Sequence, residues 1–310
     1  MILKMAAVKF LNLKPSMYSR SVVLNVLGMQ FYRTLFFYLR RVLRAPKRIK
    51  PQFAQYLKTL ERDGILVIPN FFPEDVYNEI KEEYRRLSLE FRRDDSEIPF
   101  PHVDRMSFHD KRVPDFLRQH FLNNPILKEL PRSFLNRNYN LRLEAYLVKI
   151  YCNQDELALP KNGGTNNLHF DAPLRVLKGF YYLNDADERN GPLQYCLGSQ
   201  KRNSLKRLLW EYKLSVRYAF NRWNPDHQGE YLDNEPWVKI TEGEIKAHEL
   251  KEKVVSVKRN TMVFVNVGGL HRRGEFLEPG VRETIEVNYR NAESPRNDLY
   301  FLEKKFRSLA

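Results

Sequence analysis

The chain has 310 residues, of which 43% are hydrophobic, and contains 20 Phe, 17 Tyr and 3 Trp. This composition supplies a sizeable core and excludes a disordered chain. The length fits one large β-rich domain with added helices, or two smaller domains. Cys152 and Cys196 lack Cys-x-x-Cys spacing, so we expect reduced core thiols and no disulfide framework.

The net charge of +14 is concentrated at the N-terminus. Residues 1–50 hold 11 Lys or Arg and no Asp or Glu, so the other 260 residues carry 14 less 11, or +3. A nucleic-acid-binding domain would spread basic residues over a recognisable recognition motif, and the sequence contains none. We therefore expect no nucleic-acid partner and treat residues 1–50 as a basic arm.

The arm contains a candidate amphipathic helix over residues 22–43. At about 100° per residue, one arc carries Gln30 and three arginines, with Arg44 just beyond the helix on the same arc, and the opposite arc is apolar and aromatic. A basic amphipathic helix favours peripheral contact with an anionic membrane from the cytoplasm. Three alternatives stay open: packing on the following domain, a mitochondrial targeting sequence, and a membrane span with Arg33 near its middle.

Beyond a linker at 45–51, the first half of the chain alternates helices with irregular segments. Residues 52–62 and 73–91 are predicted as helices, the second with Pro73 at its start and acidic residues in its first turn. A loop is expected over 94–115, a helix over 124–138 and a strand over 141–151.

The second half is richer in predicted strands, at 176–183, 254–257, 261–267 and 282–289. Asn190-Gly191-Pro192 marks a turn. Residues 200–252 include a basic helical stretch and form an insertion, which we expect to be either a lid over a pocket or a surface decoration.

Three potential metal ligands lie at strand ends or in the following loops. His169 and Asp171 form a His-x-Asp pair, and His271 follows a predicted strand at a Gly-Gly break. Two imidazoles and one carboxylate on one face of a metal form the facial triad of non-heme Fe(II) oxygenases. Arg282, 11 residues after His271, can hold a dicarboxylate through a bidentate fork.

Over roughly residues 60–290, these segments resemble the phytanoyl-CoA dioxygenase family. The resemblance rests on Asp63-Gly64 with its apolar continuation, the His-x-Asp pair, Asn190-Gly-Pro-Leu193, Gly198-Ser199, and His271 with Arg282. It implies a mainly β (α+β) fold: a double-stranded β-helix, or cupin-like jelly roll, with flanking helices and the N-terminal amphipathic helix. The dioxygenase domain would then occupy residues 51–310.

The resemblance also implies a function. His169, Asp171 and His271 would bind Fe(II), Arg282 would bind the distal carboxylate of 2-oxoglutarate, and Tyr181 would lie against this co-substrate. With O2, the enzyme would hydroxylate an organic substrate and release succinate and CO2. We expect a small-molecule or lipid-like substrate, and the arm favours lipid, acyl or lipid-linked glycan compounds. Two alternatives remain: a zinc-dependent hydrolase with the same ligands, and a non-catalytic membrane-associated jelly-roll protein.

Overall fold

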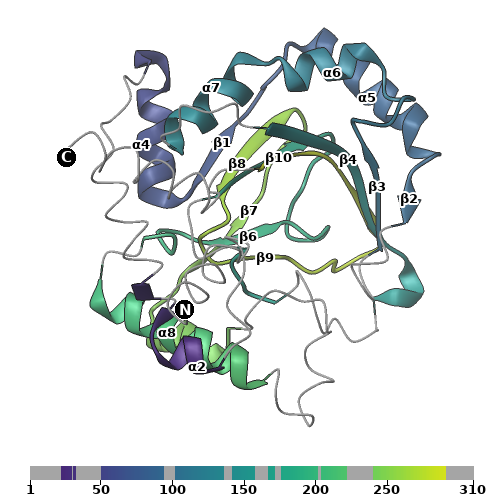
Figure 1. The fold of residues 1–310 in the computed structure, drawn as a ribbon. Coiled ribbons are helices and arrows are strands. Elements are labelled where there is room, and N and C mark those ends of the chain that lie inside the picture. Colours follow the sequence, from purple (N-terminus) through teal and green to yellow (C-terminus); the bar gives the residue numbers. More distant parts are fainter. Residues whose placement is uncertain are drawn as a thin grey trace, which may run out of the picture.

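In the computed structural model, a large and a small antiparallel sheet face each other, with helices on both outer sides (Figure 1). The structure describes residues 22–29, 31–32, 50–93, 102–135, 142–157, 167–171, 176–201, 204–221 and 240–290. The large sheet has the strand order β1-β8-β5-β10-β4-β3-β2, and the small sheet the order β7-β6-β9. Two packed antiparallel sheets form the jelly-roll core that the sequence predicted.

The strands of the large sheet come from the whole described chain. They are β1 (Ile65–Ile68), β2 (Arg92–Arg93), β3 (His102–Ser107), β4 (Arg142–Cys152), β5 (Leu177–Tyr182), β8 (Thr261–Asn266) and β10 (Gly280–Arg290). The small sheet contains β6 (Leu193–Cys196), β7 (Glu252–Val255) and β9 (His271–Arg273). β3 lies inside the segment that was expected to be a loop. It forms a strand there because it pairs with β4 and buries Val103 on one face of the sheet and Met106 on the other.

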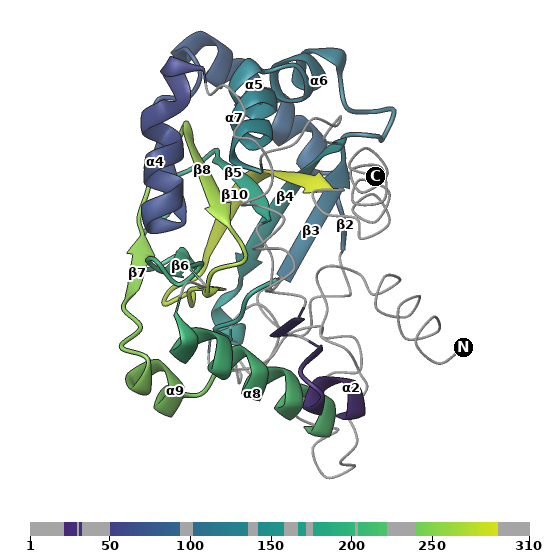
Figure 2. The ribbon, with the colours of Figure 1, turned by 60° about the vertical axis from the view of Figure 1, so that its left-hand side comes forward.

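Helices cover the outer face of the large sheet. They are α4 (Ala54–Asp63), α5 (Glu74–Ser88), α6 (Asp115–Leu122) and α7 (Pro125–Phe134) (Figure 2). α5 carries two acidic residues in its first turn and two arginines in its last turn, which complements the helix dipole. Its buried residues Tyr77, Ile80, Tyr84 and Leu87 recur every three or four positions, so one apolar stripe packs on the sheet.

A second helical layer lies beyond the small sheet. It contains α8 (Leu205–Asn221), α9 (Glu242–Ala247) and the short N-terminal α2 (Val22–Val26) (Figure 2). Trp210, Leu214 and Tyr218 of α8 form a buried cluster with Cys196 of β6, Leu168 and Phe170. The predicted insertion therefore includes a helix that packs on the outside of the small sheet.

The N-terminal segment is attached to α8 where the structure describes it. Asn25 donates from Nδ2 to the Ser215 carbonyl at 2.7 Å, and Tyr212 donates its hydroxyl to the Val26 carbonyl at 2.8 Å. Residues 33–43 of the predicted amphipathic helix lie outside the described residues. Within the described residues, no helix is long and apolar enough to cross a membrane. Both cysteines are buried, and neither forms a disulfide.

Candidate metal and co-substrate site

The small sheet and the segment beside it bring the three predicted metal ligands together. His169 forms a backbone bridge with His271, the first residue of β9, and the Asp171 amide donates to the Val267 carbonyl just after β8. All three side chains are buried, and one ligand atom from each lies within 4.8 Å of the others. The Asp171 Oδ1 atom is 3.5 Å from Nε2 of each histidine.

Backbone carbonyls orient both imidazoles. Nδ1 of His169 lies 2.6 Å from the Asn167 carbonyl oxygen, and Nδ1 of His271 lies 2.9 Å from the Gly269 carbonyl oxygen. Because a carbonyl only accepts, these contacts assign the proton of each ring to Nδ1. The Nε2 lone pairs then face Asp171, which is the orientation that metal-binding histidines require.

Lys178 of β5 sets the charge state of the carboxylate. Its Nζ lies 2.5 Å from Oδ2 of Asp171, which leaves Oδ1 directed at the two imidazoles. Burial acts to raise the pKa of the Asp171 carboxyl, but Lys178 and the two histidines outweigh it, and this pKa lies well below its usual range. Burial also lowers the pKa of His169. A carboxylate and a neutral imidazole are the forms that bind a metal ion.

The segment that carries His169 and Asp171 is held from outside by the insertion. Leu168 and Phe170, on either side of His169, are buried against Trp210, Leu214 and Ile240. The amide of Ile240 also donates to the Leu168 carbonyl at 3.3 Å. Within the described residues, α8 therefore supports the candidate metal-binding segment from behind the small sheet.

Arg282 lies near the start of β10 and is buried, with 8% of its surface exposed. Its Nη1 donates to the Gly191 carbonyl, in the predicted turn after β5. Gly191 has a φ of 67°, and an added Cβ would lie 2.6 Å from the Phe276 ring, so the turn requires glycine here. The turn thus places a carbonyl where it orients the guanidinium.

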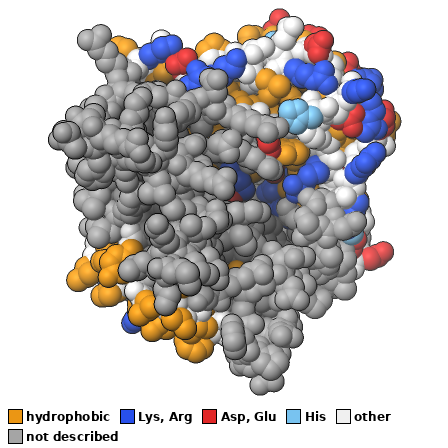
Figure 3. Space-filling model, in the orientation of Figure 1, with side chains coloured by type: hydrophobic (Ala, Val, Ile, Leu, Met, Phe, Trp, Pro, Cys, Tyr) orange, Lys and Arg blue, Asp and Glu red, His pale blue; other side chains and the backbone are white. Residues whose placement is uncertain are grey.

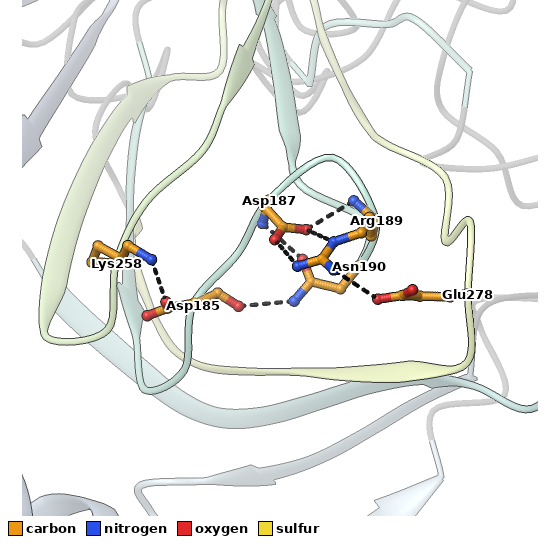
Figure 4. A network of polar contacts seen from close by, with 6 residues as sticks. All are labelled: Asp185, Asp187, Arg189, Asn190, Lys258 and Glu278. Atoms are coloured by element: carbon orange, nitrogen blue, oxygen red, sulfur yellow. Dashed lines mark hydrogen bonds and ion pairs between the residues drawn. The ribbon is translucent and has the colours of Figure 1, made fainter.

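Polar contacts brace this turn on its solvent side (Figure 4). Asn190 donates from Nδ2 to the Asp185 carbonyl at 2.8 Å, and its Oδ1 accepts from the Asp187 amide at 2.9 Å. Arg189 pairs with Asp187, and Lys258 pairs with Asp185. Asp185 and Asp187 therefore stabilise the turn, and this structural role accounts for their positions.

The face of β10 that carries Arg282 is directed between the two sheets. Its other members are Thr284, Glu286 and Asn288, because side chains alternate along a strand and Ile285 and Val287 lie in the core under the helices. Thr284 is 2% exposed, and its Oγ1 has no hydrogen-bond partner among the described residues. A buried hydroxyl of this kind, two residues from Arg282, suits a bound carboxylate.

The structure does not place Tyr181 with these residues. Tyr181 belongs to the core under the helices, packs against Phe71, Phe72 and Phe121, and donates its hydroxyl to Asn260 Oδ1 at 2.9 Å. Tyr181 therefore lies on the face of β5 opposite to the one that Arg282 shares, away from the place where the sequence predicted it. Its neighbour Tyr182 faces the space between the sheets, where Arg282 and Glu286 both affect its pKa, which burial raises.

The residues present fit a metal ion and a dicarboxylate. Two Nε2 atoms and one carboxylate oxygen converge, as a facial triad requires. Arg282 supplies a buried, permanently charged fork for a carboxylate. The two parts of the site therefore match the donor sets of an Fe(II)- and 2-oxoglutarate-dependent oxygenase.

Comparison with known proteins gives the same class. The family model described as phytanoyl-CoA dioxygenase matches residues 60–243. The chain belongs to the phytanoyl-CoA dioxygenase family, whose members use Fe(II), 2-oxoglutarate and O2. It is an iron- and 2-oxoglutarate-dependent oxygenase, so the zinc hydrolase and the non-catalytic alternatives are not supported. A search of curated proteins finds no match.

Solved structures share the fold at low identity. The epimerase SnoN, in complex with Fe3+, alpha ketoglutarate and nogalamycin RO, is 16% identical, with a TM-score of 0.53 over 78% of this chain and 87% of that one. A second SnoN structure, described as a non-heme alpha ketoglutarate dependent epimerase from nogalamycin biosynthesis, is 15% identical, with a TM-score of 0.51 over 77% of this chain and 82% of that one. At these identities the likeness establishes the jelly-roll fold.

Proposed function

We propose that this oxygenase hydroxylates a C–H bond of an organic substrate that presents hydrogen-bonding groups to the large sheet. His169, Asp171 and His271 would hold Fe(II), and Arg282 with Thr284 would hold the distal carboxylate of 2-oxoglutarate. When bound, iron with 2-oxoglutarate and O2 supplies the oxidising chemistry, with succinate and CO2 as products. The chain's own task is to orient these groups and to exclude water from them.

The observation that carries the substrate class is a group of polar residues on the inner face of the large sheet. In the pairing of β4 with β10, Glu144 lies opposite Asn288 and Tyr146 lies opposite Glu286. Residues that lie opposite each other in an antiparallel pair share a face of the sheet. Glu144 is 7% exposed, and its Oε2 accepts from the Tyr146 hydroxyl at 3.1 Å. Lys178, the partner of Asp171, lies opposite Asn288 in the same row.

This row favours a polar substrate group over an unbranched acyl chain. The buried carboxylate of Glu144 and the half-buried amide of Asn288 lose hydration when an alkyl chain covers them, whereas hydroxyl or amino groups replace the lost hydrogen bonds. The same residues can recognise the polar part of a lipid-linked molecule, which keeps the substrate expected from the sequence within this proposal.

The test compares two panels of substrates with the Fe(II)-loaded protein. One panel contains polyhydroxylated and amino compounds, and the other contains acyl thioesters and fatty acids. We expect succinate formation above the substrate-free rate, and a product heavier by one oxygen, only with members of the polar panel. Coupled turnover of plain acyl chains, with none of the polar compounds accepted, would refute the assigned substrate class.

A matched pair of variants connects the activity to the inner face. Asn288→Leu should reduce substrate-dependent succinate formation but leave the slow substrate-free turnover of 2-oxoglutarate unchanged. Leu277→Gln, an exposed position between β9 and β10, serves as the control because its side chain is 62% exposed. An equal response of both variants would show that Asn288 takes no part in substrate recognition.

A further inference from the structure

Large apolar side chains are exposed together on the helical layer outside the small sheet. We call this set the α2–α8 face: Val23, Val26, Leu27 and Tyr32 of the N-terminal segment with Leu205, Leu209 and Phe220 of α8. Leu27, Leu205, Val23 and Tyr32 are each more than 60% exposed. Hydrophobic side chains gather at the lower left of the space-filling view, where Figure 1 places α8 and α2 (Figure 3).

The exposed apolar residues of α8 form one continuous stripe along the helix. Leu205, Leu209 and Phe220 fall on one stripe with the partly buried Tyr212 and Val216, since successive members are three or four residues apart. The opposite stripe, with Trp210, Leu214 and Tyr218, packs on the small sheet. A helix that is apolar on both sides needs a second partner for its outer stripe.

Basic side chains flank the outer stripe. Lys206 and Lys213 of α8 are exposed, whereas Glu211, the acidic residue of this helix, is 1% exposed and paired with Arg207 at 3.2 Å. The hydrogen bonds from Asn25 and Tyr212 attach α2 to this helix. They thereby join the face to residues 1–50, which carry 11 basic and no acidic residues. An apolar stripe with positive charge beside it is typical of a helix that lies in the interface of an anionic membrane.

We propose that the α2–α8 face docks on an anionic lipid surface, with its apolar side chains between the lipid headgroups and its lysines on their phosphates. A membrane is favoured over a protein partner because two exposed lysines of α8 and the acid-free basic arm lie beside the apolar residues. Contact with anionic headgroups needs only net positive charge near the surface, and no defined pocket. Since the inner stripe of α8 packs on Leu168 and Phe170, docking would hold the metal site about one helix diameter, or roughly 10 Å, from the lipid.

The test measures vesicle binding by the full chain. Wild-type protein is floated with vesicles of phosphatidylcholine alone and with vesicles that also contain phosphatidylserine. We expect binding to the phosphatidylserine vesicles that weakens at high salt, because salt screens the lysine contribution but leaves the apolar one. The triple variant Leu205→Gln, Leu209→Gln and Phe220→Gln should bind these vesicles about tenfold or more weakly.

A control variant separates this face from exposed leucines in general. Leu89→Gln with Leu277→Gln changes two leucines that are 88% and 62% exposed on other elements, and it should bind vesicles as wild type does. Thermal unfolding and 2-oxoglutarate turnover should be unchanged in both variants, because every altered side chain is exposed.

Three results would overturn the proposal. The first is wild-type protein that ignores the anionic vesicles. The second is a triple variant that binds them as well as wild type, which would assign any binding to the basic arm alone. The third is a wild-type dimer in lipid-free solution that the triple variant abolishes, which would make a second copy of the chain the occupant of this face.

Discussion

Substitution of Leu214 by Ala tests whether α8 supports the metal-binding segment. Leu214 is 1% exposed and shares a cluster with Leu168 and Phe170, the two neighbours of His169. The change removes three carbon atoms, which costs about 2.4 kcal/mol of transfer free energy at about 0.8 kcal/mol per CH2. The cavity left behind adds to this, so we expect a loss of about 2–5 kcal/mol in the free energy of unfolding.

The same substitution should also weaken metal binding. If α8 fixes the position of the His169 ring, removing the Leu214 side chain is equivalent to removing a residue that orients a metal ligand. Such a loss typically lowers metal affinity about 10–100-fold. Anaerobic titration with Fe(II), or with Co(II) as an absorbing substitute, measures this affinity. Urea unfolding of the metal-free protein measures stability in parallel.

Leu117→Ala provides the matched control. Leu117 is completely buried in the other core, under the helices of the large sheet, so its truncation should cost a similar free energy of unfolding. It should leave metal affinity unchanged. If the two variants lost the same stability and bound Fe(II) equally well, the reasoning that α8 positions the metal-binding segment would be refuted.

Four further predictions concern the site and its support. Alanine at His169, Asp171 or His271 should each abolish Fe(II)-dependent turnover of 2-oxoglutarate, and full turnover in any one variant would remove that residue from the triad. Arg282→Ala should weaken 2-oxoglutarate binding by about 2–5 kcal/mol, or about 30-fold or more, with Fe(II) binding intact; calorimetry showing unchanged co-substrate affinity would assign the role elsewhere. Burial acts to raise the pKa of Glu244 on α9, but hydrogen bonds from its own N-cap and from α8 outweigh it and lower that pKa. The resulting stability is fully present above the ordinary glutamate pKa and is lost as pH falls through the lowered pKa of the folded state. Wild type and Glu244→Gln should therefore differ in urea unfolding at pH 7, and the difference should shrink as the pH is lowered below the ordinary glutamate pKa. Removal of the metal with a chelator should lower Tm, and Fe(II) at about 100 times its Kd should restore about 2.7 kcal/mol; a melting curve that is insensitive to metal would contradict the ligand set.

The three candidate metal ligands, which the structure brings together, were predictable because each is defined by its local sequence context. His169 and Asp171 are two residues apart, and His271 directly follows a strong strand pattern at a glycine break. Lys178 was not predictable, because its contact with Asp171 depends on where β5 lies relative to the preceding segment. Nothing in the sequence of β5 distinguishes this lysine from one exposed to solvent.

Tyr181 shows where the pattern was insufficient. β5 reads Leu-Lys-Gly-Phe-Tyr-Tyr, and both of its last two residues are buried, on opposite faces of the sheet. A strand covered on both faces lacks the alternation that tells one face from the other. A shift by one residue moves a side chain to the other face of the sheet. The sequence therefore could not tell that Tyr182, and not Tyr181, shares a face with Thr284.

The same limit applies to α8. Its sequence contains two apolar stripes, and the spacing of Leu205, Leu209, Tyr212 and Val216 is as regular as that of the buried Trp210, Leu214 and Tyr218. Helical periodicity alone therefore cannot select the buried face. Contact with Leu168 and Phe170, which come from a distant part of the chain, decides it.

The pairing of β1 with β8 has a consequence for how the chain folds during synthesis. Ile65 pairs with Val265, so β1 cannot pair with β8 until the ribosome has synthesised another 200 residues. At about 5–20 residues per second, roughly 10–40 s pass on the ribosome before this edge of the sheet can close. Pairings this distant in sequence slow folding, and the apolar Ile65 and Leu66 remain uncovered in the meantime. We therefore expect the nascent chain to depend on chaperones until β8 emerges, and refolding of the complete protein from denaturant to be slow and prone to aggregation.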